Sequence, residues 1–410
     1  KEEDIMKKFN KVLSVVVASA MVMAMAGCGN TDNGSAATGT NAATESAAAD
    51  NGAASGSVFK IGGIGPTTGG AAVYGLAVQH GAEIAVEEIN AAGGINGYQV
   101  EFKFQDDEAD AEKSVNAYNA LKDWGAQVLD GSTTSGACIA VTDKTKEDNM
   151  FQITPSGSAV ECVQYDNNFR VCFSNPNQGL ASAQYIGENG LAEKIAVIYD
   201  SSDVYSSGIY EKFVKEAENQ PFEVVAAEAF TADNKTDFSV QLQKAKDAGA
   251  DMVFLPIYYQ ESALILTQAA AMGYAPKWFS CDGMDGILGG VDNFDVSLTE
   301  GVMLLTPFAA DATDDLTQSF VTKYKEKYGE TPNQFAADSY DAIYVIKAAI
   351  EKSGVTPDMS VSDICDGMKA AMTEITVDGL TGNGMTWTAD GEANKAPKAV
   401  VIENGAYKAM

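Results

Sequence analysis

The chain has 410 residues and a formal charge of −30, with 57 Asp and Glu against 27 Lys and Arg. Its single arginine, Arg170, and the scarcity of clustered lysines exclude nucleic-acid binding, which needs grouped cations to neutralise phosphates. The single histidine, His80, lies within a helical pattern, and the sequence contains neither a GxSxG elbow nor an HExxH zinc motif. We therefore predict a protein that is not an enzyme and that has no catalytic residue, metal site or cofactor.

Segment 6–27 has the organisation of an export signal. Lys7 and Lys8 stand near its start, an apolar run follows over 12–25, and Ala-Gly-Cys follows at 26–28. The run is too short to span a bilayer well, and the small residues before Cys28 suit a cleavage site. This junction resembles the lipobox of bacterial lipoproteins, although Met25 stands where that family usually has Leu. The resemblance implies that Cys28 is lipidated; an ordinary secretory signal with an incidental cysteine is the alternative.

Residues 29–57 are almost entirely Ala, Gly, Ser, Thr, Asn and Asp. Such a composition buries too little apolar surface to offset the entropy of ordering. We therefore predict that 28–57, beginning with the lipidated cysteine, is a flexible tether. It would hold a globular part at the extracytoplasmic face of the cell membrane.

The roughly 350 residues beyond position 57 exceed what one hydrophobic core usually serves, so two lobes are predicted. Short β-type runs alternate with helical patterns, which favours an α/β fold of two doubly wound lobes with mostly parallel sheets. The predicted helices are 74–90, one ending at Asp123 and one continuing through Asp148. The predicted strands are 59–63, 100–105, 127–130, 150–153, 194–199, 224–230, 252–257 and 302–305.

A short internal repeat supports the two-lobe organisation. The sequences KDWGAQV at 122–128 and KDAGADM at 246–252 have the same pattern. In each, a glycine provides the turn that ends a helix, and the apolar residues after it enter a strand. The spacing fits two lobes built to the same plan.

Five cysteines remain when Cys28 is assigned to lipid. An odd number leaves at least one free thiol, and the sequence contains no CxxC pair that would suggest metal or redox chemistry. Cys162 and Cys172 either form a disulfide or are small buried apolar residues, and the sequence favours neither. The five are Cys138, Cys162, Cys172, Cys281 and Cys365.

Parallel sheets bind ligands beyond the carboxyl ends of their strands. Segment 62–70 is predicted to be a glycine-rich turn between a strand and a helix, which lets Tyr74 reach a cleft. It contains Gly63-x-Gly65 but lacks the third glycine of a dinucleotide fingerprint.

Two turns rich in small hydroxyl residues, 132–136 and 155–158, are predicted at helix starts. Free backbone N–H groups, hydroxyls and the positive end of a helix dipole suit a small carboxylate. A plain helix cap is the alternative for each turn.

The second half of the chain offers complementary groups. Tyr205, Tyr258 and Tyr259 follow predicted strands, and Asp282 follows the apolar run 278–281. An acid beside aromatic rings suits an ammonium group. The two halves together therefore predict a cleft for a zwitterion.

Four motifs carry a resemblance to a known family: IGGIGP at 61–66, EINAAGGING at 88–97, TPSGS at 154–158 and DSYDA at 338–342. The chain resembles the type I periplasmic binding proteins, in the leucine/isoleucine/valine-binding branch that delivers amino acids to ABC transporters. The resemblance covers residues 58 to about 405. It implies three crossovers between the lobes, with lobe 1 at 58–174 and 308–386 and lobe 2 at 175–307 and 387–410.

The resemblance also implies the site residues. The ligand α-carboxylate, the α-ammonium, the main-chain groups and the side-chain pocket each have expected partners. Ser135, Ser156, Gly157 and Ser158 would bind the α-carboxylate, and Asp282 would pair with the α-ammonium. Tyr205 and Tyr258 would hold the main-chain groups, and Tyr74 and Phe335 would form the side-chain pocket. Asp282 stands where better known relatives often have Glu, Ser158 replaces a threonine, and Tyr74 stands where some relatives have Trp.

The implied function is a monomeric lipoprotein that closes on one amino acid, with Leu, Ile or Val expected, and then docks on an ABC transporter permease. One alternative is a solute sensor that partners a membrane receptor, and another is the binding of a different small amino acid or an amide. An exported enzyme is disfavoured because no nucleophile–base pair is recognisable.

Overall fold

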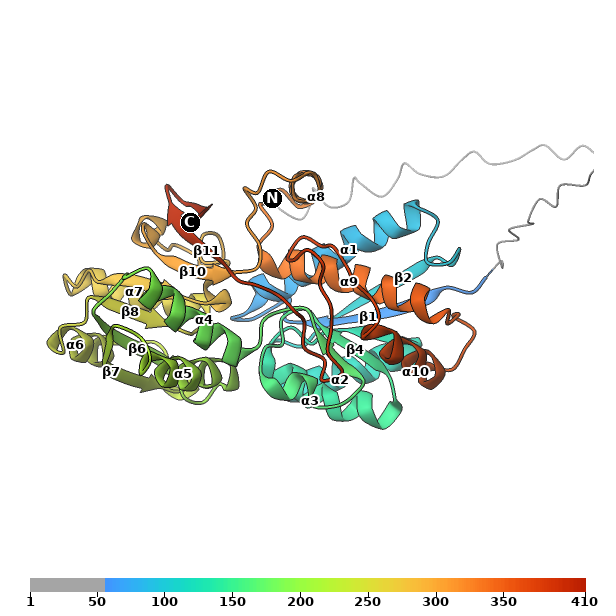
Figure 1. Cartoon of the computed structure of the whole chain (residues 1–410), viewed down its shortest axis with the longest axis horizontal. Helices are drawn as coiled ribbons and strands as arrows, with labels where there is room; N and C mark the ends of the chain where they lie inside the picture. Colours follow the sequence, from blue (N-terminus) through green and yellow to red (C-terminus); the bar gives the residue numbers. More distant parts are fainter. Residues whose placement is uncertain (1–55) are drawn as a thin grey trace, which may run out of the picture. The chain divides into compact units, whose positions relative to one another are not determined.

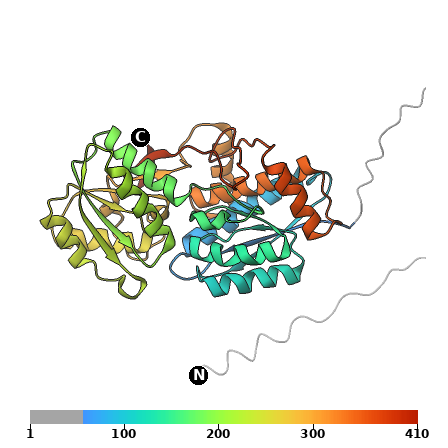
Figure 2. The same cartoon turned by 60° about the horizontal axis from the view of Figure 1, so that its bottom comes forward.

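The computed structural model describes residues 56–410, and these residues group by their contacts into one compact unit. The predicted export signal, the lipidated Cys28 and nearly all of the tether lie outside the described residues. The unit contains two β-sheets with helices on their faces (Figures 1 and 2). The prediction of an α/β fold with mostly parallel sheets is therefore confirmed.

The first sheet has the order β2-β1-β3-β4-β5, and all of its strands are parallel. Its strands are β1 (Phe59–Gly65), β2 (Val100–Asp106), β3 (Val128–Asp130), β4 (Phe151–Thr154) and β5 (Asn168–Arg170). The accompanying helices are α1 (Ala72–Ala91), α2 (Ala111–Trp124), α3 (Ser135–Asp148), the 3-10 helix η1 (Val160–Val163), α8 (Asp315–Tyr328), α9 (Gln334–Ser353) and α10 (Val361–Met372).

The second sheet has the order β7-β6-β8-β9-β10-β11-β12, and only the last two strands pair antiparallel. Its strands are β6 (Lys194–Asp200), β7 (Glu223–Phe230), β8 (Met252–Leu255), β9 (Lys277–Ser280), β10 (Met303–Thr306), β11 (Lys398–Glu403) and β12 (Ala406–Ala409). The accompanying helices are α4 (Asn175–Glu188), α5 (Val204–Ala217), α6 (Ser239–Asp247) and α7 (Tyr259–Ala271), with the 3-10 helices η2 (Ala232–Asn234), η3 (Asp282–Met284) and η4 (Val296–Thr299).

Both faces of the first sheet are covered, with α1 and α9 on one side and α2 and α3 on the other (Figure 1). Successive strand residues therefore enter different cores: Val128 packs in the cluster that includes α1 and α9, whereas Leu129 packs with Tyr118 and Leu121 of α2. This double burial explains why every residue of the central strands β3 and β4 is buried.

The internal repeat falls at equivalent places in the two sheets. The order β2-β1-β3-β4-β5 is repeated by β7-β6-β8-β9-β10. The glycine of each repeat, Gly125 and Gly249, has a positive φ (92° and 73°), and β3 or β8 begins three residues later. A left-handed residue after a helix is a position that favours glycine.

The chain passes between the two groups of elements in segments 171–174, 307–314 and 373–397, as the resemblance implied. Helix α4 packs on α5, whereas α8 packs on α1 and α10 on α9. The exact lobe boundaries stay a prediction. Over residues 56–410, no helix is both long enough and apolar enough to cross a bilayer.

The predicted glycine-rich turn at 62–70 begins too early, because β1 continues through Gly65. A Cβ at Gly63 would stand 2.4 Å from the Phe104 ring, and one at Gly65 would stand 2.1 Å from Thr133 Oγ1. Close packing therefore requires these glycines. Strand β9 was recognised only as the apolar run 278–281 before Asp282. Strands β5, β11 and β12 were not predicted, because β5 contains the polar residues Asn168 and Arg170, and β11 and β12 form an antiparallel pair outside the alternating strand–helix pattern.

The cysteines in the described part of the chain are all buried and free. The disulfide alternative for Cys162 and Cys172 is therefore wrong for this structure, and the buried apolar alternative holds. Burial raises the pKa of the Cys172 thiol, which disfavours the reactive thiolate.

Candidate functional site

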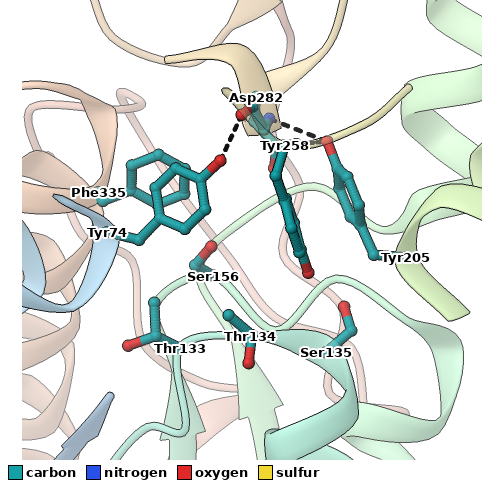
Figure 3. A pocket seen from close by; sticks show the side chains of 10 residues that line it. Tyr74, Thr133, Thr134, Ser135, Ser156, Tyr205, Tyr258, Asp282 and Phe335 are labelled. Atoms are coloured by element: carbon teal, nitrogen blue, oxygen red, sulfur yellow. Dashed lines mark hydrogen bonds between the residues drawn. The ribbon is translucent and has the colours of Figure 1, made fainter. Parts of the chain in front are cut away.

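A small cavity lies where loops after strands of both sheets meet (Figure 3). Its free volume of about 10 Å³ is room for about one water molecule, so the side chains that line it must move apart before a solute can enter. Every predicted ligand-binding residue except Gly157 and Ser158 lines the cavity. The lining residues are Tyr74, Thr133, Thr134, Ser135, Ser156, Tyr205, Tyr258, Asp282, Gly283 and Phe335.

Hydroxyl groups form the side of the cavity that belongs to the first sheet. Ser135 is the first residue of α3, and its side-chain oxygen accepts hydrogen bonds from the N–H groups of Ser158 (3.2 Å) and Ala159 (3.1 Å). The one side-chain acceptor within reach of the Ser135 hydroxyl hydrogen, among the described residues, is Ser158 Oγ, at a long separation of 3.3 Å. Figure 3 shows the oxygens of Ser135 and Ser156 on the side that faces Asp282. A carboxylate at this place would receive hydroxyl donors beside a helix N-terminus.

Thr134 is the N-cap residue of α3, but its side chain makes no capping hydrogen bond. Its hydroxyl oxygen is buried without a partner. Such a group is costly to leave unpaired. In Figure 3 the oxygen points away from the aromatic side chains, so a rotation about χ1 is needed before Thr134 can donate to a ligand.

The loop that contains Ser156, Gly157 and Ser158 differs from the prediction in one respect. It precedes η1, a four-residue 3-10 helix, so no long helix dipole acts there. The Gly157 N–H donates to Thr154 Oγ1 (2.7 Å), and the Ser158 N–H is already used by Ser135. Of the three residues only Ser156 lines the cavity, and direct ligand contacts by Gly157 and Ser158 stay a prediction.

Asp282 forms the opposite side of the cavity, at the start of η3 after β9. One carboxylate oxygen accepts from the Tyr205 hydroxyl (2.6 Å) and the other from Gln178 Nε2 (2.9 Å). The Tyr205 hydroxyl also accepts from the Gly283 N–H (2.9 Å). Burial raises the pKa of Asp282 to about 6 in spite of these hydrogen bonds. The carboxylate is therefore short of positive charge, which a ligand ammonium would supply.

Aromatic rings complete the cavity. Tyr74 contacts Phe335 with ring centroids 4.4 Å apart and lies edge-on to Tyr258 at 5.5 Å, while Tyr258 stacks on Tyr205 at 5.0 Å. The Tyr74 hydroxyl donates to the Gly283 carbonyl and accepts from the Tyr259 N–H (3.1 Å). This hydroxyl therefore joins the two sides of the cavity.

Thr133, Thr134, Gly283 and Gln178 were not predicted as site residues. The two threonines lie in the hydroxyl-rich turn, so that turn was the available signal. Gly283 directly follows the predicted Asp282. Gln178 has no local signal, because it lies within α4 and reaches Asp282 only through the packing of distant segments.

The motif DSYDA at 338–342 has a structural role. Asp338 forms an almost fully buried ion pair with Lys395 (2.7 Å), and Ser339 donates to Asp130 (2.9 Å). Asp341 accepts from the N–H groups of Leu380 and Thr381. The motif thus ties the third crossover and β3 to α9, and it does not line the cavity.

Comparison with known proteins agrees with this arrangement. The sequence profile of the family described as periplasmic binding protein matches residues 58–406. A Leu/Ile/Val-binding protein homolog 3 of Brucella melitensis biotype 1 is 31% identical over 300 residues, which are 73% of this chain and 80% of that protein. The leucine-, isoleucine-, valine-, threonine-, and alanine-binding protein of Pseudomonas aeruginosa is 30% identical over 303 residues, or 72% and 79% of the two chains.

Solved structures show the same fold. The leucine-binding protein LivK of Thermotoga maritima has a TM-score of 0.77 at 27% identity, covering 86% of this chain and 98% of its own. LivJ of Streptococcus pneumoniae, a branched-chain amino acid transporter substrate-binding protein in complex with isoleucine, has a TM-score of 0.77 at 28% identity, covering 86% and 99%. A benzoate-bound solute-binding protein from R. palustris, with 20% identity and a TM-score of 0.75, shares the fold alone. The family binds solutes and is not enzymatic, and the chain belongs to the type I periplasmic binding proteins, in their leucine/isoleucine/valine-binding branch.

Proposed function

We propose that this protein is a lipid-anchored, extracytoplasmic solute-binding protein that captures a branched-chain amino acid and delivers it to an ABC transporter. The ligand would be Leu, Ile or Val, bound between the two groups of elements. The proposal gives the site no cofactor and no chemical step.

The observation that carries the proposal is the opposite chemistry of the two sides of one small cavity. Ser135 and Ser156 offer hydroxyls beside the N-terminus of α3, whereas Asp282 offers a buried carboxylate. Donors suit a ligand carboxylate, and Asp282 suits an ammonium. A ligand with only one of these charges would leave the other side without its partner, which is costly in a buried site.

The remaining wall limits the side chain of the ligand. Tyr74, Tyr258 and Phe335 present aromatic surface, which suits a modest apolar group once the two sides of the cavity have separated. Each methylene gained or lost in such a pocket changes affinity by about 1 to 3 kcal/mol. We therefore expect Leu, Ile and Val to bind more tightly than Gly, Asp or Lys.

The location and the partners follow from the sequence and from the relatives. The lipobox-like junction before Cys28 and the polar segment after it support a lipid anchor with a tether. The likeness to LivJ, a substrate-binding protein of a branched-chain amino acid transporter, supports permease subunits as partners. Mass spectrometry of the mature chain tests the anchor: we expect a lipidated Cys28 at its N-terminus, and an unmodified Cys28 would exclude the anchor. We expect a monomer, measurable by light scattering.

Isothermal titration calorimetry tests the ligand. Leucine should bind, whereas leucinamide, which lacks the carboxylate, and 4-methylpentanoate, which lacks the amine, should each bind at least about a hundredfold more weakly, because each leaves a buried charge or donor unpaired. Recovery of unchanged leucine by mass spectrometry would exclude turnover. Tight binding of either analogue would contradict the zwitterion site, and tightest binding of a charged or non-amino-acid solute would contradict the branched-chain assignment.

A further inference from the structure

The only arginine of the chain lies directly behind the hydroxyl side of the cavity. Arg170, the last residue of β5, is fully buried. One of its terminal nitrogens donates to the carbonyls of Ser158 (2.7 Å) and Gly157 (3.3 Å), and the other donates to the carbonyl of Ala159 (2.9 Å). A guanidinium buried against three successive carbonyls is an unusual use of charge, because burying a cation is costly unless its charge is compensated.

Two of these peptide groups connect Arg170 with Ser135, which lines the cavity. The Gly157 carbonyl shares its peptide group with the Ser158 N–H, and the Ser158 carbonyl shares its peptide group with the Ala159 N–H. Those two N–H groups are the ones that donate to Ser135 Oγ (3.2 and 3.1 Å). Both peptide dipoles are thus aligned between the Arg170 cation and the Ser135 oxygen, and hydrogen bonds in such a series strengthen one another.

Contacts of its backbone and its side chain fix the position of Arg170. The backbone N–H of Arg170 donates to the Gly391 carbonyl (3.0 Å), and Trp387 Nε1 donates to the backbone carbonyl of Arg170 (2.8 Å). Arg170 Nε makes no hydrogen bond, but it forms an ion pair with Glu392 Oε2 (3.4 Å), whose side chain is 34% exposed. These contacts come from the crossover segment 373–397, so the arginine connects that segment with the loop around Ser156.

We propose that Arg170 is a positioning residue for carboxylate recognition, which acts through the two peptide groups that hold Ser135. The inference rests on the proposed function of the cavity. With its oxygen accepting two polarised N–H groups, Ser135 presents its hydroxyl hydrogen to the ligand. An arginine suits this role better than a lysine, because its planar fork serves neighbouring carbonyls at once while it keeps its charge.

The test compares leucine with leucinol, in which a hydroxymethyl group replaces the carboxylate, by calorimetry on the full chain. Arg170→Met should weaken leucine binding by at least about tenfold and leave leucinol binding nearly unchanged, so the ratio of the two affinities falls. In Arg170→Lys, which keeps the charge, the ratio should lie between those of Arg170→Met and the unmodified chain. This second variant is the one to compare if Arg170→Met does not fold. An unchanged ratio in a folded variant would overturn the proposal.

A double-mutant cycle separates positioning from general stability. In a Ser135→Ala background, Arg170→Lys should have a smaller effect on leucine affinity than in the unmodified chain, because the group through which it acts is gone. Additive losses would overturn the proposal. Glu392→Gln is the matched control: it removes the nearby carboxylate but leaves the bonds to the carbonyls, and the ratio should stay within about twofold, well short of a tenfold change. An equal fall in this variant would also overturn it.

If the unmodified chain binds neither leucine nor another branched-chain amino acid, the proposed function fails before any variant is compared. If the unmodified chain binds leucine and the ratio is insensitive to Arg170, only this inference fails.

Discussion

The two sides of the cavity come from sheets with the same strand order, yet they are assembled differently. On the first side, Ser135 is held by N–H groups 23 and 24 residues away along the chain. On the second side, Asp282 is held by Gln178 and Tyr205, which are 104 and 77 residues away. The first side is thus held by backbone N–H groups of a nearby loop. The second side is held by hydrogen bonds between side chains that meet only after the lobe has folded.

The comparison predicts that the second side is the more vulnerable. The carboxylate of Asp282 is buried, and its charge would have one specific ligand partner. We expect Asp282→Ala to weaken amino-acid binding by about a hundredfold or more, because the ligand ammonium would then be buried without a counter-charge. Calorimetry measures this loss.

Asp251→Asn is a suitable control in the same lobe. Asp251 accepts from the N–H groups of Glu193 and Lys194 at the other end of the sheet. Affinity should be unchanged in this variant even if the melting temperature falls. Near-normal affinity of Asp282→Ala would remove Asp282 from the site.

The first side should tolerate change better. Ser135→Ala removes one hydroxyl but leaves the loops and the helix N-terminus in place. A hydrogen bond to a charged group contributes about 1.5 to 3 kcal/mol, so leucine affinity should fall about ten- to a hundredfold. Ser182→Ala, at a serine that is equally buried in α4 but does not line the cavity, should change affinity little. If both variants behave alike, the Ser135 hydroxyl has no ligand role.

The pH dependence should distinguish the two sides further. The pKa of Asp282 is raised to about 6 by burial, and a ligand ammonium binds the ionised form. Affinity should therefore be constant above pH 7 and fall roughly tenfold between pH 7 and pH 5, as the carboxyl group takes up a proton. Calorimetry across this range measures it. A pH-independent affinity, or one that rises in acid, would contradict the role of the Asp282 charge.

The same shift acts on the ligand-free fold with a defined sign. Because the folded pKa is higher than the unfolded value of about 3.9, the contribution of Asp282 to stability is greatest below pH 3.9. This contribution is lost as the pH rises through about 6. Ligand binding should therefore raise the melting temperature more at pH 7 than at pH 5.

The smallest expected effect concerns the contact between the two sides. Tyr74→Phe removes the hydroxyl that joins Gly283 and Tyr259 but keeps the ring that contacts Phe335. With about 0.5 to 1.5 kcal/mol for a neutral hydrogen bond, affinity should change only a few-fold, and the order of Leu, Ile and Val should stay the same. Tyr185→Phe, whose hydroxyl reaches only Met410 Sδ at 3.9 Å, is the control. A reversed ligand order would show that the hydroxyl, and not the ring, selects the side chain.

The difference between the two sides also explains which features of the protein could be predicted from its sequence. The α/β class, the repeated lobes and the hydroxyl-rich turns were predicted, because strand periodicity, helix-ending glycines and runs of small polar residues are local features. Asp282 was found beside a recognisable strand end. Gly65, in contrast, was assigned to a turn, and its packing against Thr133 could not be predicted, since that contact joins β1 to the loop that follows β3.

The sequence by itself thus determined the fold class, the likeness to amino-acid binding proteins and most of the cavity lining, because these depend on residue type and on order along the chain. Only the tertiary structure decided that Gly157 and Ser158 lie behind the cavity, that Gln178 reaches Asp282 and that Arg170 supports Ser135. Each of these facts depends on the direction in which a buried polar group points. That direction is set by hydrogen bonds between segments that meet only in the folded protein.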